Sequence, residues 1–131
     1  EGQYEHGQSR IGAAPWDRPD LFIENSGLFG IRKITTPYLT IHNELDGAVP
    51  QFQGIEFITA MRRLGKEAYL FSFDGEDHNL KGREQQKYWT VHLDEWFDHW
   101  LKGAPRPAWM NGVDYLHRGE RNVRPLYGET D

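Results

Sequence analysis

The sequence predicts an α/β fold with parallel strands and covering helices, in which the sheet is incomplete. Short apolar runs typical of buried strands alternate along the chain with longer segments of helical periodicity. Such alternation implies helical crossovers and parallel pairing of the strands. The sequence offers two such strands, whereas parallel sheets are stable when several strands share a core covered on both faces. We therefore expect part of the sheet to lie outside this chain.

The composition is that of a globular protein and excludes several functional classes. The chain has 131 residues and five tryptophans, and disordered segments lack large rings in such number. The net charge is −5, whereas nucleic-acid binding requires clustered lysine and arginine. No apolar run approaches the ~20 residues of a membrane span. We therefore expect no nucleic-acid partner and no membrane partner.

The residues before the first strand predict mostly loop. Residues 1–18 are polar and glycine-rich and show no periodicity, so we expect irregular structure there. Pro19 suits the first turn of a helix, which predicts a short helix over residues 20–25. The Asn-Ser-Gly sequence of residues 25–27 then ends that helix.

The next segment predicts a strand followed by a helix. The run after Pro37 is rich in β-branched and aromatic residues, which favours a strand over residues 38–42. A loop over residues 43–50 leads into a segment whose apolar residues recur at every third position. Gly65 suits the end of this helix because it adopts the left-handed conformation readily. The apolar stripe comprises Phe52, Ile55, Ile58, Met61 and Leu64.

A second strand and the longest helix complete the pattern. Residues 68–73 predict a buried strand, and residues 74–79 predict a loop. The segment 84–102 has the clearest helical periodicity, and Gly103 and Pro105 end it. Its expected apolar face comprises Trp89, Leu93, Trp96, Phe97, Trp100 and Leu101.

The organisation of the chain indicates a piece of a larger protein. Residues 105–131 lack periodicity, so we expect an extended tail after a compact part over residues 1–104. The chain starts at Glu1 without a leader, and we expect a processed product or an excised piece with any targeting signal upstream. Cysteine is absent, which excludes disulfides and leaves the compartment open. A periplasmic or secreted location is favoured over a cytoplasmic one.

Two loops that follow the predicted strands carry a candidate acid and a candidate base. Asp46 lies in the first loop and His78 in the second. Because functional sites of open α/β sheets lie just beyond the carboxyl ends of the strands, we expect the two side chains to meet there. The aspartate would accept the ring Nδ1–H. Nε2 would then take a proton from a nucleophile and return it to the leaving group.

Each candidate also has a simpler interpretation. An aspartate before glycine is most often a turn residue, and a histidine in an acidic loop is most often solvated. The acidic loops raise the alternative of a metal site, although neither has a known zinc or calcium spacing. The tryptophan face of the last helix raises the alternative of a partner-binding groove, against a core role. The candidate metal ligands are His42, Glu44 and Asp46, or Asp74, Glu76, Asp77 and His78.

Three motifs occur at a specific combined spacing. The first is a Thr-Pro strand with a His-x-x-x-Asp-x-x-Val-Pro loop over residues 36–50. The others are the Arg-Arg-Leu-Gly-Lys helix end of residues 62–66 and the Asp-Gly-Glu-Asp-His sequence of residues 74–78. Together they resemble the catalytic core of the prolyl oligopeptidase family, which includes dipeptidyl peptidases and acylaminoacyl peptidases. The resemblance covers about residues 2–110 and implies the C-terminal portion of an α/β-hydrolase fold.

This resemblance implies a serine peptidase that hydrolyses peptide bonds by acyl transfer and uses no cofactor. Asp46 would be the acid and His78 the base of the catalytic triad. In this fold the serine precedes both residues along the chain, so we expect the nucleophile upstream, together with the propeller domain of the family. The implied partners are a peptide substrate and the missing N-terminal part of the same protein. The isolated chain is then expected to be inactive.

None of the three serines of the chain fits the position of the nucleophile. The nucleophile elbow is a Gly-x-Ser-x-Gly sequence between a buried strand and a helix. Ser9 has the first glycine and lacks the second, and no apolar strand precedes it. Ser26 follows a predicted helix, where capping is the expected role, and Ser72 lies within a predicted strand.

Substrate choice and two rival functions stay open. Ala48 stands two positions after Asp46, where many members of the family carry an Arg or Asn that binds a substrate carbonyl. Dipeptidyl-peptidase specificity is therefore not implied. One rival is an esterase or lipase-like hydrolase, and the other is a non-catalytic module that binds another subunit. Because an unpaired strand edge seeks another strand, we also expect self-association through the edge of residues 38–42.

Overall fold

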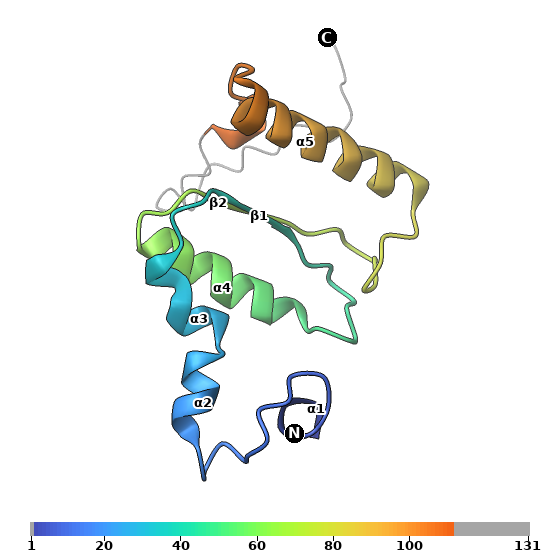
Figure 1. The fold of residues 1–131 in the computed structure, drawn as a ribbon. Helices are drawn as coiled ribbons and strands as arrows, with labels where there is room; N and C mark the ends of the chain where they lie inside the picture. The colour runs from blue at the N-terminus through green and yellow to red at the C-terminus, as the bar shows by residue number, and fades with distance from the viewer. Residues whose placement is uncertain (1, 112–131) are drawn as a thin grey trace. The chain divides into compact units, whose positions relative to one another are not determined.

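The computed structural model describes residues 2–111, and Figure 1 shows the order of the elements. These residues form two compact units that divide between Lys87 and Tyr88. The elements are α1 (Gly2–Glu5), α2 (Pro19–Glu24), α3 (Gly27–Gly30), the 3-10 helix η1 (Ile31–Lys33), β1 (Tyr38–Ile41), α4 (Gln51–Arg63), β2 (Ala68–Phe71), α5 (Arg83–Lys102) and the 3-10 helix η2 (Ala108–Met110).

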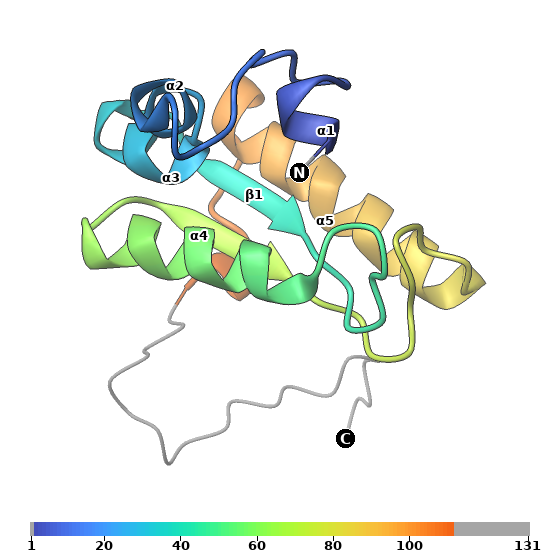
Figure 2. The same ribbon diagram turned by 90° about the horizontal axis from the view of Figure 1, so that it is seen from below.

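β1 and β2 form a parallel pair, and α4 is the connection between them. Tyr38 lies opposite Ala68, and Ile41 lies opposite Phe71. The pairing continues past the strand ends, where the His42 N–H donates to the Phe71 carbonyl over 3.0 Å. Figures 1 and 2 show α4 alongside the two strands, and it contacts β2. The predicted α/β class with a small, open, parallel sheet is confirmed, although each strand ends slightly earlier than predicted.

The hydrophobic core of the first unit lies between α4, β2 and the segment that precedes β1. Its buried members are Ile31, Ile58, Met61 and Ala68. The rings of Tyr38 and Phe57 pack against this cluster with a centroid distance of 5.1 Å. Burial of each large aliphatic side chain contributes roughly 1.5–3 kcal/mol. The cluster therefore holds α4 against the strand pair and keeps the strands in register.

The buried stripe of α4 differs from the predicted one. Ile58 and Met61 are buried, and the other three members of the predicted stripe are exposed. An α-helix has about 3.6 residues per turn, so a stripe drawn at every third residue drifts away from the core at both ends. The helix instead buries Gly54 in its first half. The exposed members are Phe52, Ile55 and Leu64.

The end of α4 agrees with the prediction. Gly65 has a φ of 67°, and the Lys66 N–H donates to the Met61 carbonyl over 3.1 Å, which is the backbone pattern of a glycine helix end. Arg62 Nε donates to the Ala68 carbonyl over 2.9 Å. The left-handed glycine thus turns the chain directly from the helix into β2.

The prediction of loop over residues 1–18 is partly wrong. α1 is a short helix, and the N–H groups of Ile11 and Gly12 donate to the carbonyls of Tyr4 and Glu5 over 3.1 and 2.8 Å. The chain therefore turns back on α1. The sequence has no periodic pattern that predicts these hydrogen bonds. α2 agrees with the predicted helix. α3 and η1 are additions, because helices of one turn hold too few residues for a periodic signal.

α5 agrees with the predicted helix, but its apolar face is narrower than expected. From Tyr88 onward it belongs to the second unit, in which Trp96 is buried while Phe97 and Leu101 are exposed. Phe97 lies about 100° and Leu101 about 140° around the helix from Trp96, so both leave the buried face. Trp100 is also exposed, although its ring contacts that of Trp96 edge-on at 5.7 Å. Within residues 2–111, no helix is both long and apolar enough to cross a membrane.

The segment after α5 folds back on that helix. The Trp109 ring of η2 lies 6.3 Å from the Trp96 ring, and its Nε1–H donates to the Glu95 carboxylate over 2.8 Å. Residues 105–111 therefore form a packed turn where extended chain is predicted. The remainder of the predicted tail, residues 112–131, lies outside the described residues.

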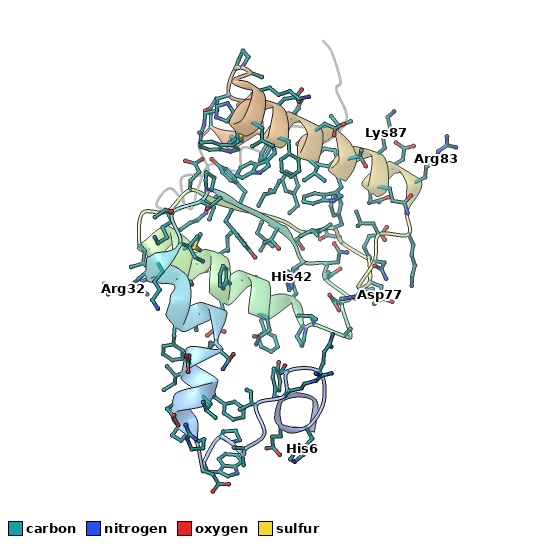
Figure 3. All side chains as sticks on the ribbon, in the orientation of Figure 1. His6, Arg32, His42, Asp77, Arg83 and Lys87 are labelled. Carbon is teal, nitrogen blue, oxygen red and sulfur yellow. The ribbon has the colours of Figure 1, made fainter. Side chains whose placement is uncertain are left out.

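We expect Gly54→Ala to destabilise the first unit. The His42 ring faces α4 (Figure 3), and a methyl group added at Gly54 would lie 2.6 Å from Cγ of that ring. Alanine otherwise favours a helix interior by about 1 kcal/mol, so the steric conflict decides the sign. Overpacking typically costs about 1–3 kcal/mol, so we expect a net loss of up to about 2 kcal/mol in the free energy of unfolding, measured by urea titration with circular dichroism.

Gly30→Ala is the matched control for this substitution. A Cβ at Gly30 meets nothing within 4 Å, and its φ of −80° suits alanine. We therefore expect little change in stability. Equal losses in the two variants would contradict the close packing of His42 on α4.

Candidate active site

The structure brings Asp46 and His78 together at the carboxyl ends of the two parallel strands. Asp46 lies in the loop after β1, and His78 lies in the loop after β2. The Nδ1 atom of His78 is 3.0 Å from Oδ2 and 3.1 Å from Oδ1 of Asp46. Parallel strands end at the same edge of a sheet, so the register of β1 and β2 joins residues 32 positions apart.

Backbone amides of its own loop hold Asp46 in place. Oδ1 accepts the N–H of Ala48 over 2.9 Å and the N–H of Val49 over 2.8 Å. The side chain keeps 6% of its surface exposed. The Val49 N–H contributes most to a lowered pKa of the Asp46 carboxyl, His78 and Ala48 contribute less, and partial burial opposes them. Asp46 is therefore an ionised acceptor at neutral pH.

His78 directs its second ring nitrogen away from Asp46. An ionised carboxylate only accepts hydrogen bonds, so Nδ1 carries the proton and donates it to Asp46. The neutral ring in this tautomer has its lone pair on Nε2. The His78 side chain is 52% exposed, whereas that of Asp46 is nearly covered. In this tautomer Nε2 is the ring nitrogen that could accept a proton.

Three further hydrogen bonds of 3.0 Å or shorter join the loop of Asp46 to the loop of His78 within residues 2–111. Each of the three involves one of the residues that directly precede Asp46, either as donor or as acceptor. The sequence predicts no role for Asn43, whereas Glu44 and Glu76 are candidate metal ligands and Glu44 is also an alternative acid. The one signal that could have indicated these residues is their position directly after two neighbouring strands. The bonds are Asn43 Nδ2–H to the Asp77 carbonyl at 2.7 Å, Gly75 N–H to the Glu44 carboxylate at 3.0 Å, and Leu45 N–H to the Glu76 carbonyl at 3.0 Å.

The structure places the serines in three different settings. Ser9 lies in an exposed bend after α1. Ser26 occupies the N-cap position of α3 without a side-chain capping bond. Ser72 lies just beyond β2 instead of within it, and its Oγ accepts a hydrogen bond from Gln51 Nε2 over 2.6 Å.

The described residues do not support the alternative of a metal site. Within residues 2–111, no group of three or more His, Cys, Asp or Glu side chains is placed to hold a metal ion. The candidate ligands have other contacts. Asp77 forms an ion pair of 3.1 Å with Lys81, and the His42 ring packs on Gly54 of α4.

A strand–helix–strand unit with an acid loop and a base loop at its carboxyl edge defines part of an α/β-hydrolase. Residues 3–104, well over half of the chain, match the sequence pattern of the Prolyl oligopeptidase family. The chain therefore belongs to the prolyl oligopeptidase family. The resemblance drawn from the three motifs is confirmed.

Curated relatives agree with this assignment. The chain is 30% identical over 102 residues to the "Uncharacterized peptidase YuxL" of Bacillus subtilis. The matched region covers 76% of this chain and 14% of that protein. It is 26% identical over 87 residues to the "Probable dipeptidyl-peptidase 5" of Aspergillus niger. Here the matched region covers 65% of this chain and 12% of that protein. Both relatives are named peptidases, and the chain spans only about one eighth of their length.

The lowered pKa of Asp46 predicts an acid-sensitive contribution to stability. A carboxyl whose pKa is lower in the folded chain than in the unfolded chain stabilises the fold above its ordinary pKa of about 4. This contribution is lost as the pH falls through the lowered folded value. We therefore expect Asp46→Asn to reduce stability at neutral pH and to flatten the further loss on acidification. Urea unfolding at neutral pH and at about pH 3 measures both effects.

Asp74→Asn is the control for this pH dependence. Asp74 is an exposed carboxylate in the loop of His78, so its removal changes the charge equally. We expect this variant to follow the acid profile of the unmodified chain. An acid loss of the same size in Asp46→Asn would contradict the assignment of that loss to Asp46.

Proposed function

We propose that this chain is part of a serine peptidase that hydrolyses peptide bonds through a Ser–His–Asp triad. Asp46 is the acid of this triad and His78 is the base. The observation that carries the proposal is the 3.0 Å contact between His78 Nδ1 and the Asp46 carboxylate at the carboxyl edge of parallel strands. Membership of the prolyl oligopeptidase family and the peptidase names of the relatives support it.

The proposed reaction proceeds by acyl transfer. The serine Oγ attacks the substrate carbonyl while His78 Nε2 takes the serine proton, and His78 then returns that proton to the leaving amine. Water, deprotonated by the same nitrogen, hydrolyses the resulting acyl-enzyme. Asp46 keeps the ring in the Nδ1–H tautomer and stabilises the imidazolium form. The reaction uses no cofactor.

The nucleophile in this proposal lies outside the chain. In α/β-hydrolases the serine precedes the acid and the base, on a sharp turn between a buried strand and a helix. Ser9 precedes both residues, but it occupies an exposed bend after the one-turn helix α1. The partner implied is the remainder of the same peptidase, and the substrate is a peptide.

The isolated chain is expected to hydrolyse no peptide bond. Without a serine beside His78, no acyl-enzyme forms and the base has no hydroxyl to activate. Labelling of the purified chain with a fluorophosphonate probe tests this expectation, and Ser9→Ala is the control variant. Stoichiometric labelling that disappears in Ser9→Ala would show that the chain carries its own nucleophile.

In the full-length peptidase, His78→Ala is expected to abolish turnover. Asp46→Asn is expected to lower kcat by about 10⁴-fold, because the amide favours the wrong tautomer of His78. Steady-state assays with matched peptide and ester substrates measure both effects and separate a peptidase from an esterase. Near-normal activity of Asp46→Asn with an essential His78 would assign the acid to Glu44 or Asp77.

A further inference from the structure

Two buried polar side chains lie in the loops of Asp46 and His78. Asn43 keeps 3% of its surface exposed, and Glu76 keeps 7%. Polar side chains are rarely covered to this extent unless hydrogen bonds compensate for the lost hydration. Their hydrogen-bond partners therefore indicate what holds the two loops.

Glu76 closes the loop of His78 on itself. Oε2 accepts the Lys81 N–H over 2.6 Å, and Oε1 accepts the Gly82 N–H over 2.9 Å. Hydrogen bonds to a carboxylate are roughly twice as strong as those between neutral groups. A Cβ at residue 82 would lie 2.5 Å from Glu76 Oε1, so glycine is what lets the carboxylate approach. The side chain thus joins a residue before His78 to two residues after it.

Asn43 fixes the opposite side of His78. Its Nδ2–H donates over 2.7 Å to the carbonyl of Asp77, the residue directly before His78. Figure 3 labels Asp77 in this loop. The Leu45 N–H adds a bond of 3.0 Å to the Glu76 carbonyl. The base loop is therefore anchored to the acid loop on its N-terminal side and closed by Glu76 on its C-terminal side.

We propose that Asn43 and Glu76 form a polar clamp that positions the His78 ring for proton transfer. This proposal rests on the proposed function of His78 as the base. The His78 side chain is 52% exposed, so packing covers only part of it. The clamp fixes the backbone on both sides of the ring instead. Such positioning has a large effect, because a displacement of about 1 Å can cost about 10²-fold in rate.

The variants Glu76→Gln and Asn43→Ala test the clamp. Glutamine keeps the shape of Glu76, but its side-chain NH₂ group faces a backbone N–H, so one of the two hydrogen bonds is lost. Alanine removes the side-chain N–H of Asn43 that donates to Asp77. Glu76→Asp keeps both carboxylate oxygens and is expected to restore part of the function. Asp74→Asn removes the same charge from an exposed position of the same loop and serves as control. Circular dichroism identifies the variants that fold, and Asn43→Ala carries the test alone if Glu76→Gln does not fold.

Nitrogen-15 NMR of the 131-residue chain gives the first readout, which is the tautomer of His78. We expect the Nδ1–H tautomer to predominate in the unmodified chain and in Asp74→Asn. We expect this predominance to be lost in the two clamp variants, because a displaced ring no longer donates to Asp46. Folded clamp variants with an unchanged tautomer would overturn the proposal.

Steady-state kinetics of the full-length peptidase give the second readout. We expect each clamp variant to lower kcat by about 10- to 10²-fold with little change in KM, and Glu76→Asp to recover part of the loss. A change confined to KM would overturn the proposal. If the tautomer changes in the clamp variants while His78→Ala leaves the peptidase fully active, the positioning of the ring stands and the proposed function fails.

Discussion

The parallel hydrogen bonding between β1 and β2 is the constraint on which the rest of the structure depends. The register sets Ile41 opposite Phe71, so the loops that follow leave the sheet side by side at one edge. The buried cluster around Met61 supports this register because it packs α4, the connection between the strands, against them. Neither Asp46 nor His78 contributes to that core. Their meeting is a consequence of backbone pairing, and a shift of register would separate them without changing either loop.

Beyond the strand ends, polar contacts replace apolar packing. The Asp46 side chain is almost completely buried. Two backbone N–H groups of its own loop donate hydrogen bonds to its carboxylate, in addition to the contact with His78. His78 is half exposed and keeps one nitrogen free for chemistry. This unequal burial suits an acid that only orients and a base that must exchange protons. The buried side chains of Asn43 and Glu76 form hydrogen bonds to the backbone on either side of His78.

The sequence predicted the strand–helix–strand order and the proximity of Asp46 and His78, because both follow from periodicity and from the geometry of parallel strands. It predicted the buried side of α4 poorly, since three-residue spacing is only a local approximation to a helix and Gly54 carries no hydrophobic signal. It missed the loop contacts of Asn43 and Glu76 for a different reason. Hydrogen bonds to backbone groups of another loop leave no pattern in composition or spacing, and they become visible only when both loops are placed.

Ala48 contacts Asp46 through its backbone and not through its side chain. Its backbone N–H donates to Asp46 Oδ1, and its side chain takes no part in that bond. Any residue except proline therefore supplies the same donor at this position. The side chain at position 48 is exposed, so a change of side chain there leaves the contacts of Asp46 unaltered. An alanine at this position thus presents no polar side chain and leaves the hydrogen bond to Asp46 intact.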